Sequence, residues 1–223
     1  MAKTFNDIWE NVHKNARWGR YPSEDVVRFV ARNYYSKDRS SIKILDLGCG
    51  AGSNTWYLAR EGFDVYAVDG SAAAVRKNLS YLDELGLRAN VAVSDLAELK
   101  YGDGFFDVVI DSAAISANTV NAVAMILSET YRVLKTNGTL FSTGLFSYEA
   151  TGFGDGKEIE TGTYDNIGKG PLSNLGTVHF FTREEVVRLC TDAGFKDLSI
   201  DTLTRTERGG EVVVSYFMVS ANK

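Results

Sequence analysis

Short apolar segments rich in valine and isoleucine recur along the chain, and helix-like segments separate them. Strands that are buried on both faces of a parallel sheet have this continuous apolar character. Alternating strands and helices therefore predict an α/β fold with a doubly wound sheet. The expected strands are Ile42 to Leu47, Val65 to Val68, Asn90 to Val93, Phe106 to Asp111, Thr139 to Thr143, Leu198 to Leu203 and Val212 to Val219.

Helices are expected to begin near Ser53, Ala72, Asn118 and Arg183. Thr182 followed by Glu185 is typical of a capping box, which predicts where the last of these helices starts. The final two strands are joined by the short polar segment Thr-Arg-Thr-Glu-Arg-Gly-Gly-Glu. This segment is too short for a crossover helix, so we expect those two strands to pair antiparallel.

Two segments lie outside this alternation, although we expect residues 1–223 to form a single domain. Within residues 1–40, Phe5 to Asn15 and Glu24 to Tyr35 resemble two helices, with a hinge at Gly19-Arg20-Tyr21-Pro22-Ser23 where proline favours a break and Ser23 can cap. These helices could form a cap over a ligand site. Residues 146–178 are rich in glycine and polar residues without sustained periodicity, which is typical of a lid or an acceptor-binding loop.

The first strand runs into a glycine-rich turn, Gly48-Cys49-Gly50-Ala51-Gly52, and then into a helix. Glycine has no Cβ atom, so the backbone can bend tightly there and approach a ligand. The helix beyond the turn offers unpaired N–H groups at its N-terminus. The turn therefore predicts a site at which an amino-acid carboxylate could bind.

Two acidic residues follow the next two strands. Asp69 comes about 20 positions after the glycines, where a carboxylate can accept hydrogen bonds from both ribose hydroxyls. The alternative for Asp69 is a helix N-cap. Asp95 follows the third strand and could accept the exocyclic amine of an adenine, the alternative being a solvated loop carboxylate. This spacing suits NAD and S-adenosylmethionine (SAM) equally.

Taken together, these motifs resemble the class I SAM-dependent methyltransferases, whose first motif matches Ile44 to Gly52. The later motifs follow in order at Val68-Asp69-Gly70-Ser71, Ser94-Asp95-Leu96, Phe106 to Asp111 and Tyr131 to Leu140. The resemblance implies a seven-stranded sheet of order 3-2-1-4-5-7-6 with strand 7 antiparallel. It also implies SAM as the cofactor and S-adenosyl-L-homocysteine as its product. Gly52 stands one position early for the Gly-x-Gly-x-x-Gly of dinucleotide enzymes, which favours SAM.

The resemblance also implies roles for individual residues. Asp46, Gly48, Cys49 and Gly50 would surround the methionine part of SAM. The ribose would lie at Asp69, Gly70 and Ser71, and the adenine near Asp95 and Leu96. Asp111 and Ser112 would border the reacting sulfonium. Apart from the resemblance, Trp18 falls in the predicted hinge and not within a helix, so it could stack on adenine or contact the sulfonium through a cation–π interaction. No metal ligand is expected.

Methyl transfer from a sulfonium is an in-line displacement, so the enzyme chiefly brings the acceptor atom to about 3 Å from the methyl carbon. A hydroxyl acceptor would gain from a nearby base, and the two histidines are His13 and His179. His179 is the expected catalytic residue, because it follows the glycine-rich segment and could face the cofactor. A structural or exposed histidine is the alternative reading. His13, on an amphipathic N-terminal helix, ranks below it.

Charge and composition narrow the possible partners. The net charge of −5 and the pI near 5.2 argue against a nucleic-acid substrate. No signal peptide or membrane span is evident, so we expect a cytoplasmic protein without a membrane partner. Cys49 and Cys190 lie far apart without a Cys-x-x-Cys pattern, so neither a zinc site nor a disulfide is indicated.

The expected function is transfer of a methyl group from SAM to an oxygen or nitrogen of a small-molecule acceptor by a monomer or homodimer. Arg17 to Glu24 and Gly176 to Glu185 resemble a bacterial subgroup that modifies small molecules or sugars. Two alternatives stay open. One is a non-catalytic SAM-binding module, and the other is an NAD-dependent oxidoreductase.

Overall fold

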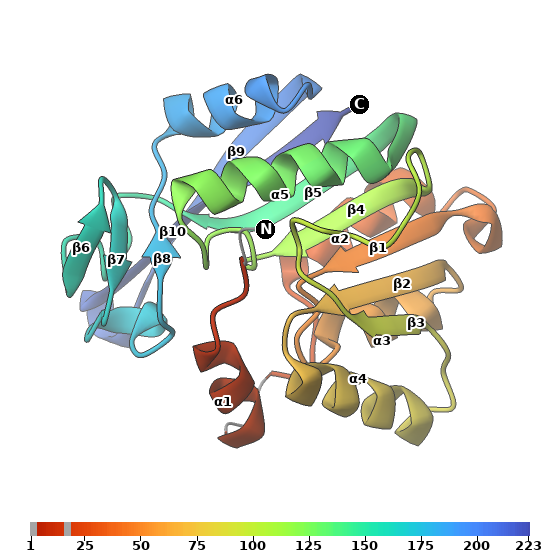
Figure 1. Ribbon diagram of the computed structural model, residues 1–223, viewed down its shortest axis with the longest axis horizontal. Coiled ribbons are helices and arrows are strands. Elements are labelled where there is room, and N and C mark those ends of the chain that lie inside the picture. The colour runs from red at the N-terminus through yellow and green to blue at the C-terminus, as the bar shows by residue number, and fades with distance from the viewer. Residues whose placement is uncertain (1–3, 16–18) are drawn as a thin grey trace.

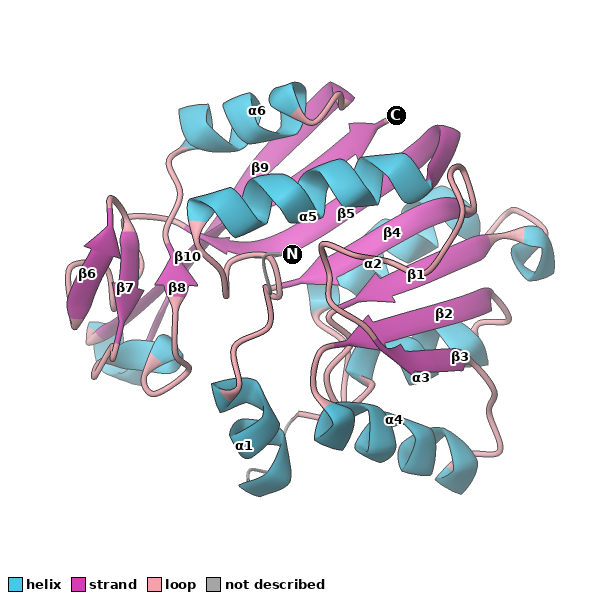
Figure 2. Ribbon diagram, in the orientation of Figure 1, coloured by secondary structure: helices cyan, strands magenta, loops and turns pink. Residues whose placement is uncertain are grey.

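A computed structural model describes residues 4–15 and 19–223 of the chain, which fold around one central sheet (Figures 1 and 2). Its strands are β1 (Lys43–Leu47), β2 (Asp64–Asp69), β3 (Asn90–Val93), β4 (Phe106–Ser112), β5 (Leu134–Phe146), β9 (Lys196–Glu207) and β10 (Val212–Asn222). They lie in the order β3-β2-β1-β4-β5-β10-β9. β10 pairs antiparallel with both of its neighbours, whereas the pairs among the first five strands are parallel. The expected topology is confirmed.

Helices cover both faces of this sheet (Figure 2). They are α1 (Ile8–Asn15), α2 (Glu24–Tyr34), α3 (Ser53–Arg60), α4 (Ala72–Glu84), α5 (Val120–Val133) and α6 (Arg183–Asp192), with short 3-10 turns η1 (Arg39–Ser41), η2 (Gly170–Leu172) and η3 (Arg208–Gly210). α5 and α6 pack on one face, and α2 and α3 pack on the other. The helices expected after Ser53, Ala72, Asn118 and Arg183 are all present.

Successive side chains of β1 pack alternately against the helices on the two faces of the sheet. Ile44 belongs to the apolar cluster beneath α2 and α3, whereas its neighbour Leu45 belongs to the cluster beneath α5 and α6. Both side chains are completely buried. Successive strand residues point to opposite faces, so a sheet covered on both sides needs the continuous apolar runs seen in the sequence.

Hydroxyl side chains set the starts of the helices. Ser23 accepts from the backbone N–H of Val26 at the start of α2, and Thr182 accepts from Glu185 at the start of α6 at 3.1 Å. Both expected caps are confirmed. The Glu185 side chain does not complete a capping box in the described structure, because one of its carboxylate oxygens contacts His179 instead.

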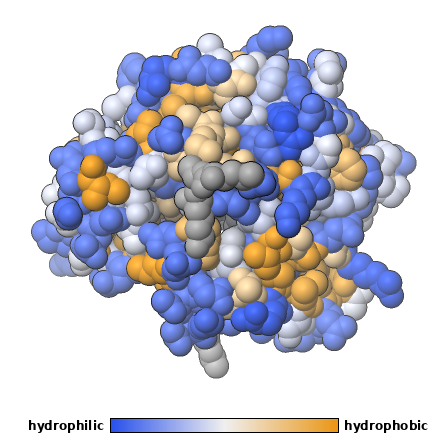
Figure 3. Space-filling view, viewed as in Figure 1, coloured by the Kyte–Doolittle hydropathy of each residue, from blue (hydrophilic) through white to orange (hydrophobic). Residues whose placement is uncertain are grey.

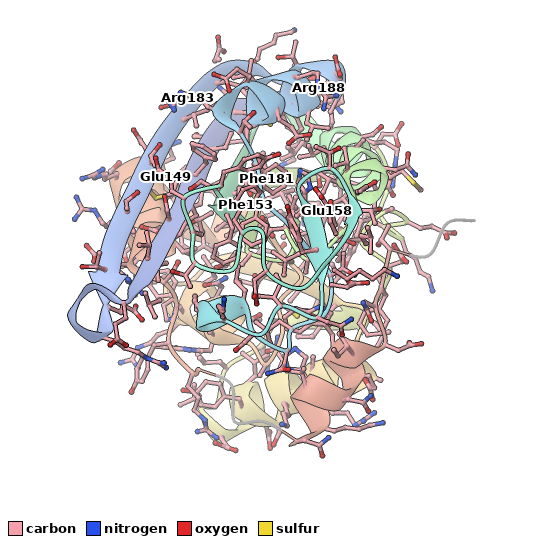
Figure 4. The ribbon with its side chains drawn as sticks, turned by 90° about the vertical axis from the view of Figure 1, so that its left-hand side faces the viewer. Glu149, Phe153, Glu158, Phe181, Arg183 and Arg188 are labelled. Atoms are coloured by element: carbon pink, nitrogen blue, oxygen red, sulfur yellow. The ribbon has the colours of Figure 1, made fainter. Side chains whose placement is uncertain are left out.

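Residues 146–178 are more ordered than their sequence suggests. β6 (Lys157–Glu160) and β7 (Thr163–Asp165) pair antiparallel, and β7 also pairs with β8 (Val178–His179). This small sheet has an apolar cluster of its own around Tyr164 and Phe180. Figure 4 faces this region and shows Phe153 and Glu158 on it, with Arg183 and Arg188 along α6 above. The strands are too short for a period-2 pattern to be seen in the sequence.

The N-terminal segment reaches the carboxyl edge of the sheet before it turns into α1 (Figure 1). α1 begins at Ile8 rather than at Phe5, because the Asn6 side chain accepts from the Ile8 N–H at 3.0 Å and ends the extended stretch before it. Arg17 and Trp18 lie outside the described residues. No helix within 4–15 or 19–223 is long and apolar enough to cross a membrane. The face in Figure 3 is largely hydrophilic, with apolar side chains gathered near β3 and α4.

Candidate active site

A cavity of about 170 Å³ lies where β1, β2 and β4 end. In parallel sheets, ligands bind beyond the carboxyl ends of the strands, where the chain connections diverge. The lining comes from three parts of the molecule: the N-terminal segment, the loops after β1 to β3, and the loop after β4. The lining residues are Thr4, Phe5, Asn6, Trp9, His13, Gly48, Cys49, Gly50, Ser53, Asn54, Asp69, Gly70, Ser94, Leu96, Ser112, Ala113, Ala114, Ala117 and Asn118.

The glycine turn forms one wall of the cavity. Gly48 has a φ of +69°, and a Cβ atom there would lie 2.2 Å from the Cβ of Ala114, so only glycine fits this position. Ser53 and Asn54, in the first turn of α3, line the cavity beside it. Asn54 is buried, and its Oδ1 atom has no hydrogen-bond partner within the described residues. The N–H groups at a helix N-terminus suit the carboxylate of an amino-acid group, and the buried Asn54 acceptor suits its ammonium.

Asp46 supports this turn from behind and does not line the cavity. One of its carboxylate oxygens accepts from the Thr55 hydroxyl at 2.6 Å, and the other accepts from the Asn54 amide at 3.4 Å. Burial raises the pKa of Asp46 to about 6. Both oxygens of Asp46 thus face α3, where they hold Asn54 and Thr55 beside the glycine turn.

Asp69 lies where it was expected, in the wall of the cavity. Its Oδ2 accepts from the Gly50 N–H at 2.9 Å, and its Oδ1 accepts from the Ser71 N–H at 2.8 Å. Burial raises the pKa of this carboxyl, while the two backbone donors act in the opposite direction. Gly70 also lines the cavity, but Ser71 does not, because its hydroxyl donates to Glu10 at 2.6 Å.

Asp95 does not reach the cavity, although Leu96 does. The backbone N–H of Thr4 donates to Asp95 Oδ2 at 2.8 Å, and the Thr4 hydroxyl donates to Oδ1. Ala97 donates a further bond to Oδ1 at 3.0 Å. Burial opposes ionisation of Asp95, but the hydrogen bonds from Thr4 and Ala97 outweigh it and lower its pKa. Asp95 thus holds the N-terminal segment against the loop after β3.

The loop after β4 forms the opposite wall. Ser112 lines the cavity, and Ala113 beside it adopts a φ of +65°, which is uncommon for a residue with a side chain. Asp111 stays behind this wall. It accepts from the N–H groups of Ala114 at 2.9 Å and Ile115 at 3.1 Å, and from the Ser142 hydroxyl at 2.6 Å. Burial raises its pKa to about 7. Asp111 thus shapes the loop that carries Ser112.

His179 is fully buried and does not line the cavity, contrary to expectation. Its Nδ1 lies 2.7 Å from the Thr163 hydroxyl, and its Nε2 lies 3.0 Å from a Glu185 carboxylate oxygen. The hydrogen bond from His179 lowers the pKa of Glu185. Both ring nitrogens are engaged in joining β7 to α6, which is the geometry of a structural histidine.

His13 and Trp9 of α1 do line the cavity. His13 is buried, and its Cε1 atom would lie 3.3 Å from a Cβ atom at Gly50. Burial lowers the pKa of His13. Sequence reasoning ranked this histidine below His179, since a helix seen alone does not show which distant turn it packs against. The glycine at position 50 was the available signal for such a close approach.

The described residues fit SAM by their chemistry. The α3 N-terminus and Asn54 suit a carboxylate and an ammonium, and the Asp69 carboxylate suits ribose hydroxyls. Cys49 also lines the cavity, and burial raises the pKa of its thiol well above the ordinary value. It is therefore a neutral, apolar part of the wall.

Sequence comparisons match parts of this chain to methyltransferases. Residues 44–138 match the family model described as "Methyltransferase domain". An uncharacterized methyltransferase of Synechocystis sp. is 37% identical over 97 residues, which cover 43% of this chain and 43% of that protein. A ubiquinone biosynthesis O-methyltransferase of Rickettsia prowazekii is 28% identical over 206 residues, covering 90% of this chain and 78% of that protein.

Among solved structures, a SAM-dependent methyltransferase of Methanosarcina mazei superposes with a TM-score of 0.72 at 22% identity. The superposition covers 91% of this chain and 98% of that one. The chain spans between a third and a half of the length of several curated relatives that it matches.

Residues 44–138 thus resemble a methyltransferase domain, and the chain shares the fold of a solved SAM-dependent methyltransferase.

Proposed function

We propose that this chain transfers the methyl group of S-adenosylmethionine to an oxygen or nitrogen atom of a small molecule. One observation carries the proposal: two walls face the same cavity, the first formed by the glycine turn and Asp69 and the second by the loop after β4. Gly50 and Asp69 lie on the first wall, and Ser112 and Asn118 lie on the second. An acceptor held against the second wall would share a partly enclosed space with the cofactor.

When bound, SAM supplies an electrophilic methyl group on a positively charged sulfur. The chain supplies binding and orientation, which are the main requirements of an in-line displacement. Asp69 would hold the ribose and the α3 N-terminus the amino-acid group of the cofactor, while Trp9 and the apolar Ala114 would exclude water from the space between the walls. Trp9 also presents an aromatic ring, which attracts cations.

A hydroxyl acceptor must lose a proton, and His13 is our candidate to receive it. Its ring lies in the cavity wall, and burial lowers its pKa, so the imidazole is neutral and able to accept a proton near pH 7. His179 is the competing candidate from the sequence, but both of its nitrogens are hydrogen-bonded away from the cavity.

A small-molecule acceptor fits the remaining features. The net charge of −5 is opposite in sign to what polyanion binding needs. The Rickettsia prowazekii relative is named as an O-methyltransferase of ubiquinone biosynthesis. That likeness supports oxygen as one candidate acceptor atom.

Isothermal titration of the purified, cofactor-stripped protein with S-adenosylhomocysteine, and with NAD in parallel, tests the cofactor. Micromolar binding of S-adenosylhomocysteine alone is the expected result. Binding of NAD, or of neither ligand, would overturn the proposal. Methyl-labelled SAM offered with a panel of small phenols, alcohols and amines then tests transfer. Cofactor binding without transfer to any acceptor would favour the non-catalytic module.

A further inference from the structure

The N-terminal segment forms the roof of the cavity and is fixed at several points. Asn6 and Trp9 line the cavity from above the strand ends, and the Asn6 amide donates to the Thr177 hydroxyl at 3.4 Å. Further along, Glu10 accepts from the Ser71 hydroxyl at 2.6 Å and from the Ala73 N–H at 3.0 Å. The first of these bonds is the main reason that the pKa of Glu10 falls to about 2. A carboxylate at the start of α4 also interacts favourably with the helix dipole.

The first residues of this segment are tied to the loop after β3. Both the backbone N–H and the hydroxyl of Thr4 donate to Asp95. These bonds join positions 91 residues apart in the sequence and hold the adjoining Phe5 over the loops after β2 and β3. Phe5 therefore has a defined place in the cavity wall and is not a loose terminal side chain.

Gly70 makes room for Phe5. A Cβ atom at Gly70 would lie 2.1 Å from Cδ2 and 2.5 Å from Cγ of the Phe5 ring. Unlike Gly48 and Gly50, Gly70 does not have a positive φ, so its backbone would accept other residues. Space, and not backbone conformation, requires glycine at position 70. The Phe5 ring fills the volume that a side chain at this position would occupy.

We infer that Phe5 forms one wall of the subsite for the adenine base of SAM, in place of the side chain that Gly70 lacks. The inference rests on the proposed function. With the amino-acid group at the α3 N-terminus and the ribose at Asp69, the base extends past Asp69 to the end of the cavity lined by Gly70, Ser94 and Leu96. An aromatic ring and a leucine offer a planar base the apolar and stacking surface that it needs.

Binding of two ligands that share the adenosine part tests whether Phe5 acts on the base. S-adenosylhomocysteine carries base, ribose and amino acid, whereas 5′-methylthioadenosine lacks the amino acid. Phe5→Ala should weaken binding of both ligands by the same factor, between about 5-fold and 150-fold, the range for losing one base–aromatic stack. Phe153→Ala is the matched control, because Phe153 is a partly exposed aromatic residue that does not line the cavity. Titration calorimetry should show no change for this control.

A double-mutant cycle tests the part played by Gly70. Gly70→Ala alone should weaken S-adenosylhomocysteine binding at least 5-fold, because its Cβ displaces the Phe5 ring. In the Phe5→Ala background the same substitution should cost less than 2-fold, since the space is then open. Additive effects of the two substitutions would overturn the inference. Thermal melts verify that each variant is folded.

Other outcomes are equally decisive. Tighter binding by Phe5→Ala would show that the ring occupies the place of the base, and unchanged binding would show that it touches neither ligand. Either result overturns the inference while leaving the proposed function intact. Failure of the unmutated protein to bind S-adenosylhomocysteine would overturn the proposed function itself.

Discussion

Replacing His179 by alanine should unfold the protein at a lower temperature, because this side chain joins two parts of the fold. Its ring is completely buried between the Thr163 hydroxyl at 2.7 Å and the Glu185 carboxylate at 3.0 Å, and it packs edge-on to Phe181 with ring centroids 4.4 Å apart. The substitution leaves the Thr163 hydroxyl without this partner at a site that is also fully buried.

The size of the effect follows from these contacts. The Thr163 hydroxyl keeps its hydrogen bond to Glu160 at 3.0 Å, so losing its bond to His179 costs about 0.5–1.5 kcal/mol. Losing the bond to the Glu185 carboxylate costs about 1.5–3 kcal/mol. We therefore expect His179→Ala to lower the free energy of unfolding by about 2–4.5 kcal/mol. For a chain of this size, about 2–4 °C of Tm is lost per kcal/mol. The Tm should therefore fall by about 4–18 °C.

Differential scanning calorimetry at pH 7.5 measures this change. Arg188→Ala is the matched control, because Arg188 is the exposed second partner of Glu185 at 3.3 Å. An exposed ion pair is worth about 0–1 kcal/mol, so the control should lose no more than about 4 °C. A His179→Ala protein with the Tm of the unmutated chain but without methyl transfer would refute the structural role and restore His179 as a catalytic base.

Three further predictions concern the carboxylates and one helix start. Asp69→Asn should weaken S-adenosylhomocysteine binding by about 10- to 100-fold, as expected for loss of a charge-assisted hydrogen bond, whereas Asp192→Asn on exposed α6 should leave it unchanged by calorimetry. Burial raises the pKa of Asp111 to about 7, so its ionisation removes stability as the pH rises from about 4 through 7. The Tm of Asp111→Asn minus the Tm of the unmutated protein should therefore increase between pH 5 and pH 8. A difference that stays constant over this range would contradict the raised pKa of Asp111. Thr182→Ala removes the cap of α6 and should lower the Tm by about 2–4 °C, for a loss of about 1 kcal/mol; an unchanged melt would show that the cap contributes nothing.

The sequence by itself determined the central sheet and the glycine turn, because both depend on signals within a few residues. A strand buried on both faces is apolar throughout, and the run ending at Leu47 is followed at once by the glycines that start α3. The antiparallel β10 followed from the short connection after β9 in the same way. The small sheet within residues 146–178 was missed, because strands as short as Val178–His179 leave no periodic pattern.

Which acidic side chains line the cavity was decided only by the tertiary structure. Asp46, Asp69, Asp95 and Asp111 all stand at or just beyond strand ends, yet Asp69 alone of the four lines the cavity. A carboxylate turns towards the donors around it, and those donors come from remote parts of the chain. Asp95 turns to Thr4, and Asp111 accepts from a hydroxyl on β5.

The same reason separates the two histidines. His179 was expected in the site and His13 was ranked below it, but long-range packing buries the first between β7 and α6 and brings the second against Gly50. Local sequence patterns report on backbone periodicity and turns. The partners of a polar side chain depend on the packing of distant elements, which no local pattern records.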